Sequence, residues 1–556
     1  MKNLFLCSLK MPANFESEDI SGEAVMVPRR AILCWIFVLL SPFALAQEPP
    51  LSGVEDQRTN AAVAERDRSD SDASRHRPTE SAKSPGPGVL ELLPPDSVTE
   101  HNLSVGDQKI AYTATAGTLN LLGQNGERSA GIFYTAYVVA KGPTGARPLT
   151  FVFNGGPGAA SAFLHLGLVG PKVLNFGPDG RDGANAKLVD NPDSWLRFTD
   201  LVLIDPVGTG WSRPAKADGA SNFYGVRQDA QAIAKAIALY VSHNGRSSSP
   251  KYLFGESYGG FRAVKVAQVL RRDQGIVMSG IIMLSPLLEG SLTFDGSQFA
   301  LGAALQLPSM AATELEHRKA FSKEAIEEIE RFALTDYLTI LAGPSPTEEA
   351  AQSFYAHVAK LTGLAVDVVR RTRGFVRKSY IKHIREQGQA IVSAYDASFG
   401  APDPFPESDS DESPDPILEG FVRAYGGAFA SYARDELGFK TEMTYTLLAT
   451  DVNEKWDWGK NPGGAGSRAS ASGDIRELLA LVPSFRFIIA QGYSDLVTPY
   501  GIAKYVIGHL PPELASSRVQ LKLYRGGHML YTSPASRSEF TEDAKAFLAL
   551  RSDKLP

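Results

Sequence analysis

Cysteine is almost absent from the chain. Of 556 residues only Cys7 and Cys34 are cysteine, and both precede residue 47. The rest of the sequence has no thiol, which excludes a disulfide scaffold, a cysteine nucleophile, a thiolate zinc site and an iron–sulfur centre there. We expect no bound metal and no other cofactor.

An excess of basic charge is also lacking. The chain has 56 basic and 62 acidic side chains, a formal net charge of -6. A protein with a negative net charge has no overall electrostatic attraction for a phosphate backbone, so nucleic acid is not an expected partner. The hydrophobic fraction of 43% and charged fraction of 21% are typical of a globular protein. The length fits one large α/β domain with a sizeable insertion.

The N-terminal hydrophobic run is short for a membrane span. It follows an Arg pair, is interrupted at Pro42, and leads to a small-x-small ending at Ala46. These are the parts of a secretory signal peptide, so we expect a cleaved signal over residues 1–46, with Met26 as an alternative start. We therefore expect an exported protein, periplasmic or secreted. A retained signal that tethers it to the membrane is the alternative.

Residues 47–95 are rich in Ser, Asp, Arg, Pro and Glu and have few large hydrophobic side chains. This composition cannot bury enough surface to offset the entropy lost on ordering, so it predicts a disordered tether. No later segment is long and apolar enough to span a bilayer, so we expect no stable membrane insertion after signal cleavage.

Short hydrophobic runs alternate with helical patterns in the rest of the chain. Runs such as 149–153, 201–204 and 252–254 are typical of buried strands. Buried strands that alternate with helices predict an α/β fold with a mixed, mostly parallel central sheet flanked by helices. We assign its two parts to residues 96–300 and 451–556.

Residues 301–450 have a different pattern. Consecutive helical windows follow one another without a strong strand-like run. They predict a helical cap inserted into the sheet domain. Within it, residues 402–416 contain six acidic residues and no basic one. We interpret this stretch as a solvated surface loop, with binding of a cationic substrate as the alternative.

A Gly-x-Ser-x-Gly pattern at 255–259 is the strongest catalytic signal. A hydrophobic strand precedes it and a helical pattern follows at once, which is the context of a nucleophile elbow with Ser257 as the nucleophile. Glycine on either side lets strand and helix approach closely. Backbone N–H groups at the start of the helix would face the developing oxyanion.

A serine nucleophile needs a base and an acid that orients it, and in this fold class they follow in the order Ser, acid, His. His528 follows a glycine pair after an alternating strand, whereas His509 lies in a helical window, so His528 is the favoured base. Asp495 lies in the loop after the strand at 485–490 and is the expected acid. The alternative for Asp495 is a cap on the helix that begins near Tyr500.

Five motifs together resemble the serine carboxypeptidases (peptidase family S10), which are α/β-hydrolases that remove C-terminal amino acids from peptides. The motifs are Asn-Gly-Gly-Pro-Gly at 154–158, Asp-Pro-Val-Gly-Thr-Gly-Trp-Ser at 205–212, Gly-Glu-Ser-Tyr-Gly-Gly at 255–260, Gly-x-x-Asp at 492–495 and Gly-Gly-His-Met at 526–529. The first also follows a strand, and its glycines suit a second oxyanion donor. The cysteine that relatives often have next is Ala159, which points to a bacterial-type exported member.

The resemblance implies peptide substrates and three sets of site residues: the triad Ser257, Asp495 and His528; the oxyanion hole from the backbone N–H groups of Gly156 and Tyr258; and the substrate-binding residues Asn154, Gly155, Glu256 and Met529. Asn154 and Glu256 match residues that bind the terminal carboxylate of the substrate. Two carboxyl groups can pair only if one is protonated, so the resemblance implies best peptidase activity in acid.

One position departs from the family pattern. A second glutamate usually stands two residues before the Gly-Pro found here at 170–171, and this chain has Leu168 there. Carboxylate recognition would then be weaker or supplied elsewhere, and the nearby His165 is as well explained by packing. Three interpretations stay open: an exported carboxypeptidase, an esterase or carboxypeptidase-like acyltransferase with the same triad, and a non-catalytic envelope binding protein.

Overall fold

The structure is a computed structural model that describes most of the chain beyond residue 87. The described ranges are 88–139, 147–177, 180–296, 298–344, 346–383, 390–407, 414–459 and 466–550. The expected signal peptide lies outside the described residues, as does the expected tether up to residue 87. No helix within these ranges has the length and hydrophobicity needed to cross a membrane.

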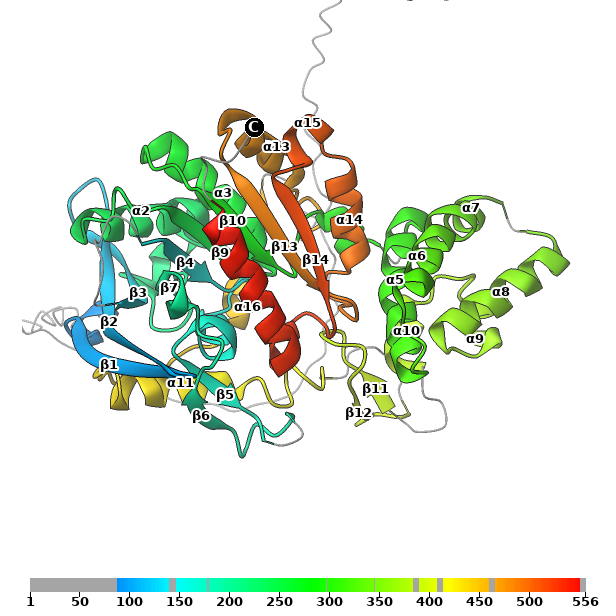
Figure 1. The fold of residues 1–556 in the computed structure, drawn as a ribbon, viewed down its shortest axis with the longest axis horizontal. Helices are drawn as coiled ribbons and strands as arrows, with labels where there is room; N and C mark the ends of the chain where they lie inside the picture. The colour runs from blue at the N-terminus through cyan, green and yellow to red at the C-terminus, as the bar shows by residue number, and fades with distance from the viewer. Residues whose placement is uncertain are drawn as a thin grey trace, which may run out of the picture. The chain divides into compact units, whose positions relative to one another are not determined.

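A mixed sheet in the order β1-β2-β3-β7-β4-β9-β10-β13-β14, with β8 paired to β3, forms the centre (Figure 1). Its strands are β1 (Ser97–Val105), β2 (Gln108–Leu122), β3 (Arg128–Val139), β4 (Leu149–Phe153), β7 (Asp200–Ile204), β8 (Arg213–Pro214), β9 (Lys251–Glu256), β10 (Gly280–Leu284), β13 (Arg486–Gly492) and β14 (Val519–Tyr524). From β7 to β14 neighbouring strands are parallel, and from β1 to β7 they are antiparallel. This order and these directions confirm the predicted α/β-hydrolase fold.

Helices cover both faces of the sheet. In β9, Leu253 packs into the core beneath α2 (Val226–His243) and α3 (Tyr258–Asp273). The next residue, Phe254, packs into the core on the other face, beneath α16 (Pro534–Ala549), which crosses the sheet in red in Figure 1. Burial on both faces explains why the strands read as continuous hydrophobic runs.

Shorter elements connect these layers. They are α1 (Ala162–Leu164), β5 (Lys172–Asn175), β6 (Lys187–Asp190), α4 (Gly290–Phe294), α12 (Thr450–Glu454), α13 (Ser472–Leu481), α14 (Tyr500–Gly508) and α15 (Pro512–Ala515).

A 3₁₀ helix at Val89–Leu92 begins the described part. Leu90 is 4% exposed, and Leu90 and Leu93 lie against Gly131 of β3. The disordered tether that we expected over residues 47–95 therefore does not include Leu90 and Leu93, because these leucines bury enough apolar surface to hold their segment on the sheet.

The expected cap divides into two parts. Its first part is helical and gathers around its own hydrophobic cluster. The helices are α5 (Ala300–His317), α6 (Lys323–Phe332), α7 (Leu338–Ala342), α8 (Glu348–Thr362), α9 (Val366–Arg371) and α10 (Arg377–His383). A two-stranded sheet of β11 (Ala390–Val392) and β12 (Gly400–Pro402) follows, which the sequence pattern did not predict.

The last part of the expected cap belongs to the main core instead. In α11 (Ala424–Asp435) Phe429 packs against Phe133 of β3, and the Tyr432 hydroxyl accepts a hydrogen bond from Tyr137 at 3.2 Å. The assignment of 424–435 to a cap was wrong because a helical pattern shows which face is apolar but not which neighbour covers it.

The acidic stretch at 402–416 is described at its two ends, with 408–413 outside the described residues. Asp403 forms an ion pair with Lys382 at 3.3 Å, and each side chain is 5% exposed. Asp415 accepts hydrogen bonds from the backbone of Ala394 and Ile417. These two carboxylates have structural partners, so the expectation of a solvated loop does not hold for them.

Candidate active site

Ser257 stands between the end of β9 and the start of α3 with a φ of 59° and a ψ of -126°. A positive φ is strained for a residue with a side chain and is typical of a nucleophile elbow. A Cβ at Gly255 would lie 2.0 Å from the carbonyl oxygen of Gly259. Strand and helix therefore cross so closely that only glycine fits, which explains the spacing seen in the sequence.

His528 and Asp495 come from the loops after β14 and β13. The His528 Nδ1 lies 2.9 Å from the Asp495 Oδ2, which also accepts a hydrogen bond from the Thr498 hydroxyl at 2.9 Å. The other oxygen, Oδ1, accepts from the backbone N–H groups of Val497 and Thr498. The carboxylate is thereby held as an acceptor toward Nδ1, so the Nε2 of His528 is left as the basic nitrogen.

The ionisation of His528 follows from these neighbours. Burial lowers the pKa of His528, but the charge and hydrogen bond of Asp495 outweigh burial, so the pKa lies above its usual 6.5. His509 has a different place: its Nδ1 bonds to the Tyr505 carbonyl within the last turn of α14. The geometry is that of an oriented base for His528 and of a helix-end residue for His509.

The predicted residues converge on one cavity of about 140 Å³. Its lining includes every residue we assigned to the site except Asp495, which lies behind His528. A Cβ at Gly155 would lie 2.6 Å from the backbone nitrogen of Tyr258, so the glycine loop presses against the start of α3. Backbone N–H groups of the two predicted oxyanion donors are thus on neighbouring walls.

The motif at 205–212 is hydrogen-bonded to the segment that follows the glycine loop. Asp205 is buried, and its Oδ1 accepts hydrogen bonds from the Ser161 backbone at 2.8 Å and the Ser161 hydroxyl at 2.7 Å. Ser161 comes three residues after Gly158, the last residue of the glycine loop. This contact gives the second family motif a structural role that the sequence alone did not assign.

Glu256 is a buried carboxyl in the wall of the cavity. Its Oε2 accepts hydrogen bonds from the Asn154 side-chain amide and from the Tyr531 hydroxyl, the latter at 3.2 Å. Within the described part of the structure, its buried Oε1 has no hydrogen-bond partner. Burial raises the pKa of Glu256 to about 7. A neutral, proton-bearing Glu256 is therefore well populated near neutral pH, and not in acid alone.

The position of the missing second glutamate holds no substitute carboxyl. Leu168 is buried, and its carbonyl accepts a hydrogen bond from the Asn191 amide at 2.7 Å. His165 packs among aromatic rings, with its Nε2 2.7 Å from the Tyr137 hydroxyl, and burial lowers its pKa to about 3. His165 therefore does not replace the glutamate.

Sequence reasoning missed a loop that joins the acid and histidine loops, residues 394–398, which we call the clamp loop. The Tyr395 carbonyl accepts from the His528 N–H at 2.5 Å, and the Ala394 carbonyl accepts from the Leu496 N–H at 3.0 Å. The Asp396 Oδ1 accepts from the Ser494 hydroxyl at 2.7 Å. No motif marks this loop, because its contacts join segments about a hundred residues apart.

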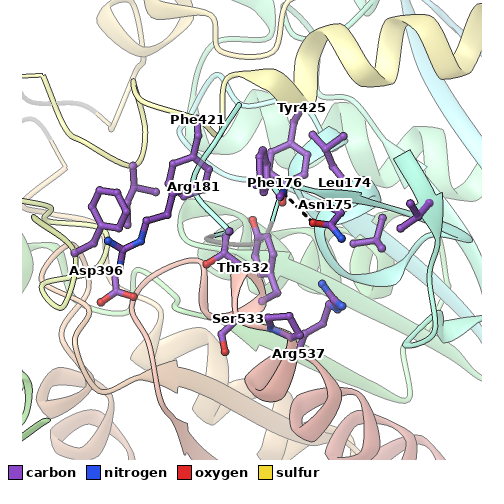
Figure 2. Close-up of a pocket in the computed structure, with 18 of the residues that line it drawn as sticks. Leu174, Asn175, Phe176, Arg181, Asp396, Phe421, Tyr425, Thr532, Ser533 and Arg537 are labelled. Carbon is purple, nitrogen blue, oxygen red and sulfur yellow. Dashed lines mark hydrogen bonds between the residues drawn. The ribbon is translucent and has the colours of Figure 1, made fainter. Parts of the chain in front are cut away.

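A second cavity, of about 610 Å³, is drawn in Figure 2. Tyr531, Tyr425 and Asp396 line it, and Arg181 and Arg537 stand at opposite sides of it. The Arg181 guanidinium lies 4.1 Å from the centre of the Phe399 ring. Tyr531 thus links the two cavities: it lines the second, and its hydroxyl bonds to Glu256 in the wall of the first.

Metal ligands do not gather in the part of the chain that the structure describes: no group of three or more His, Cys, Asp and Glu side chains could hold an ion there. The cavity brings together a serine, an oriented imidazole and backbone N–H donors, which are the groups that acyl transfer requires.

Comparison with known proteins finds similarity to serine carboxypeptidases. The family model "Serine carboxypeptidase" matches residues 107–337, a stretch that includes Ser257 but not Asp495 or His528. Serine carboxypeptidase S10 family member 1 from Dictyostelium discoideum is 30% identical over 148 residues, 26% of this chain and 33% of that protein. Serine carboxypeptidase-like 36 from Arabidopsis thaliana is 27% identical over 168 residues, 29% of this chain and 33% of that protein. The chain thus spans about a third of the length of these curated relatives.

Solved structures resemble the chain only weakly. A thermostable carboxyl esterase from Bacillus coagulans aligns with a TM-score of 0.34 and 13% identity, over 78% of this chain and 97% of that one. The fold assignment therefore rests on the strand order and directions of the sheet itself.

Proposed function

Residues 107–337 match the serine carboxypeptidase family model, and from this premise we propose that the chain is an exported serine carboxypeptidase that releases C-terminal amino acids from peptides. The observation that carries the proposal is the single cavity in which the strained Ser257, the Asp495-oriented His528 and the buried Glu256 meet. The first two features serve acyl transfer, and Glu256 offers a way to select a free terminal carboxylate.

In the proposed mechanism His528 Nε2 takes the proton of the Ser257 hydroxyl as the oxygen attacks the scissile carbonyl. The backbone N–H groups of Gly156 and Tyr258 receive the oxyanion of the tetrahedral intermediate. The C–N bond then breaks, and His528 gives its proton to the leaving amino group. Water, activated by His528 in the same way, hydrolyses the acyl-enzyme and restores Ser257.

Recognition of the substrate would rest on Asn154 and Glu256, with Gly155 and Met529 as further walls of the cavity. A protonated Glu256 can donate a hydrogen bond to a carboxylate, whereas an ionised one repels it. A peptide with a free C-terminus is therefore the expected substrate, and a C-terminal amide should gain nothing from this contact.

An esterase or carboxypeptidase-like acyltransferase is the second candidate. Leu168 favours it, because no carboxyl stands at the position where relatives carry a second glutamate. The same Ser257, Asp495 and His528 would act in either case. A non-catalytic binding protein has less support, since binding alone requires neither a strained serine nor an oriented imidazole in the same cavity.

One experiment separates these functions. Purified protein is incubated with an N-blocked dipeptide acid, the matching dipeptide amide and a simple ester, beside a Ser257→Ala variant. Preferred cleavage of the acid, lost in the variant, supports a carboxypeptidase. Ester turnover without dipeptide cleavage supports the second candidate and contradicts the first. Failure of a fluorophosphonate to label Ser257 would support a binding protein.

Export is a separate proposal that rests on residues 29–46. Expression of the full chain with its own N-terminus, followed by N-terminal sequencing of the mature protein, tests it. We expect the mature chain to begin at Gln47 outside the cytoplasm. An intact N-terminus in the membrane fraction would show that the signal is retained as a tether.

A further inference from the structure

The two oxygens of Glu256 have different surroundings. Asn154 and Tyr531 both donate to Oε2, and no described group bonds to Oε1. The direction of the Asn154 amide is fixed, because its Oδ1 accepts the backbone N–H of Leu164 at 3.1 Å. Its nitrogen must therefore be the atom that faces Glu256.

This arrangement determines where a proton on Glu256 can lie. A proton on Oε2 would meet the Asn154 NH₂ group, which can only donate, and would cost hydrogen bonds that this oxygen accepts. A proton on Oε1 meets no such conflict. Since Glu256 lines the cavity of Ser257, Oε1 is the oxygen left to bond with a ligand there.

We propose that Tyr531 is a specificity-determining residue: together with Asn154 it occupies Oε2, so that Glu256 presents a protonated Oε1 to a free substrate carboxylate, and its hydroxyl sets the pH above which such substrates are refused. The inference rests on the proposed carboxypeptidase function and goes beyond it, since no family motif includes Tyr531.

Tyr531 is held firmly enough for this role. It is fully buried, and a Cβ at Gly167 would lie 2.4 Å from its ring. Its ring therefore packs directly on the residue before Leu168, the position where the family pattern has a second carboxyl. The neighbouring Thr532 and Ser533 line the second cavity (Figure 2), as does Tyr531 itself, while the Tyr531 hydroxyl bonds to Glu256 in the wall of the first.

The charged and titratable groups around Glu256 are His528, Asp495, Tyr395, Tyr425 and Tyr531. A protonated His528 lowers the pKa of Glu256, and the Asp495 carboxylate raises it. Burial raises the pKa of all three tyrosines, so they stay neutral in the working range. Glu256, with a pKa of about 7, and His528, with a pKa above 6.5, change charge near neutral pH.

The sign of the Tyr531 effect follows from its role as a donor. A hydrogen bond from the hydroxyl favours the ionised carboxylate and so lowers the pKa of Glu256. Its removal in Tyr531→Phe raises this pKa, so protonated Glu256 persists to higher pH. A hydrogen bond to a charged group corresponds to a shift of about one pH unit.

The test compares Tyr531→Phe with the wild type on a dipeptide acid and its amide across a pH series. In the wild type, KM for the acid should rise as pH passes through about 7, where Glu256 ionises. In Tyr531→Phe this rise should move up by about one pH unit, while the amide shows no such rise in either protein. Tyr425→Phe is the matched control, because this buried tyrosine also lies beside Gly167 but makes no described hydrogen bond to Glu256.

Glu256→Gln gives an independent check that does not depend on folding of the tyrosine variant. Its amide oxygen can accept from Asn154 and Tyr531, which leaves the NH₂ group to donate to the substrate carboxylate at every pH. The rise of KM with pH for the acid should disappear. Retention of the rise, or loss of the preference for acid over amide, would overturn the inference.

A readout without substrate separates this inference from the proposed function. A protonated carboxyl group gives an infrared band, and the band that disappears in Glu256→Gln can be assigned to Glu256. The intensity of this band across a pH series reports the ionisation of Glu256 directly. Its midpoint pH should increase in Tyr531→Phe and not in Tyr425→Phe. An unchanged midpoint overturns the role of Tyr531 whatever the activity. Absence of peptide cleavage by the wild type, with the midpoint shifted, would instead contradict the proposed function alone.

Discussion

The clamp loop leads to a prediction about Asp396, whose Oδ1 accepts three described hydrogen bonds. The donors are the Ser494 hydroxyl at 2.7 Å, the Ser398 hydroxyl at 2.7 Å and the Ser398 N–H at 3.0 Å. Ser494 is the residue before Asp495. Removal of Oδ1 should therefore loosen Asp495, the proposed acid of the triad, as well as the clamp loop.

The magnitude can be worked out from these contacts. Three hydrogen bonds to a half-buried carboxyl contribute about 2 to 4 kcal/mol in total, which Asp396→Ala should lose. A displacement of the acid loop by about 1 Å would lower kcat/KM by about 100-fold. Asp396→Asn keeps an oxygen at the Oδ1 position, so its stability should stay within about 1 kcal/mol of the wild type.

The pH dependence separates charge from geometry. Burial raises the pKa of Asp396 above that of an unfolded chain, although its hydrogen bonds oppose this shift. Ionisation then reduces stability as pH rises through the folded-state pKa. Asp396→Asn carries no such charge, so its stability relative to the wild type should improve from acidic to neutral pH.

Chemical denaturation of both variants, together with the rate of fluorophosphonate labelling of Ser257, measures these effects. Asp396→Ala should unfold at lower denaturant and label slowly, whereas Asp396→Asn should label at nearly the wild-type rate. Equal loss in both variants would show that the charge matters and the acceptor geometry does not. A fully active Asp396→Ala would refute the positioning role.

Three further predictions follow from the site. Asp495→Asn should lower kcat by about 10,000-fold, measured with the preferred substrate, because an amide nitrogen facing His528 favours the wrong tautomer. Gly527→Ala should abolish labelling of the nucleophile, because its Cβ would lie 1.9 Å from the Tyr395 carbonyl oxygen, whereas Gly508→Ala, with nothing within 4 Å, should label normally. For an ester substrate, kcat/KM should fall only toward acid, below a pKa that exceeds 6.5, because the base must be neutral; a fall toward alkaline pH would contradict the assignment of that limb to Glu256.

Local patterns predicted what depends on neighbours in the chain. The elbow is a strand, a turn and a helix within a few residues, so the glycine spacing between a strand pattern and a helical pattern was enough to locate Ser257. Chain order in the fold class then located Asp495 and His528. The structure brings them together as expected, and their catalytic roles stay a prediction that the variants above test.

Contacts between distant segments could not be predicted in the same way. Asp396 and Tyr531 carry no motif, and their importance comes from partners that lie 98 and 275 residues away. The helix at 424–435 shows the same limit, since Phe429 and Tyr432 could have served an insertion or the main core equally well. Only the folded chain shows which surface each apolar face covers.

The positions of Asp495 and His528 relative to each other also depend on the clamp loop, which is remote from both in the sequence. The residues that hold the acid and histidine loops together belong to a stretch between the inserted helices and α11, and no covalent cross-link secures them. Protein segments open locally with free energies well below that of global unfolding. A brief opening of this stretch, or a single cut within it, should abolish the proposed activity while the sheet stays folded, so loss of activity and loss of structure should be separable events in this protein.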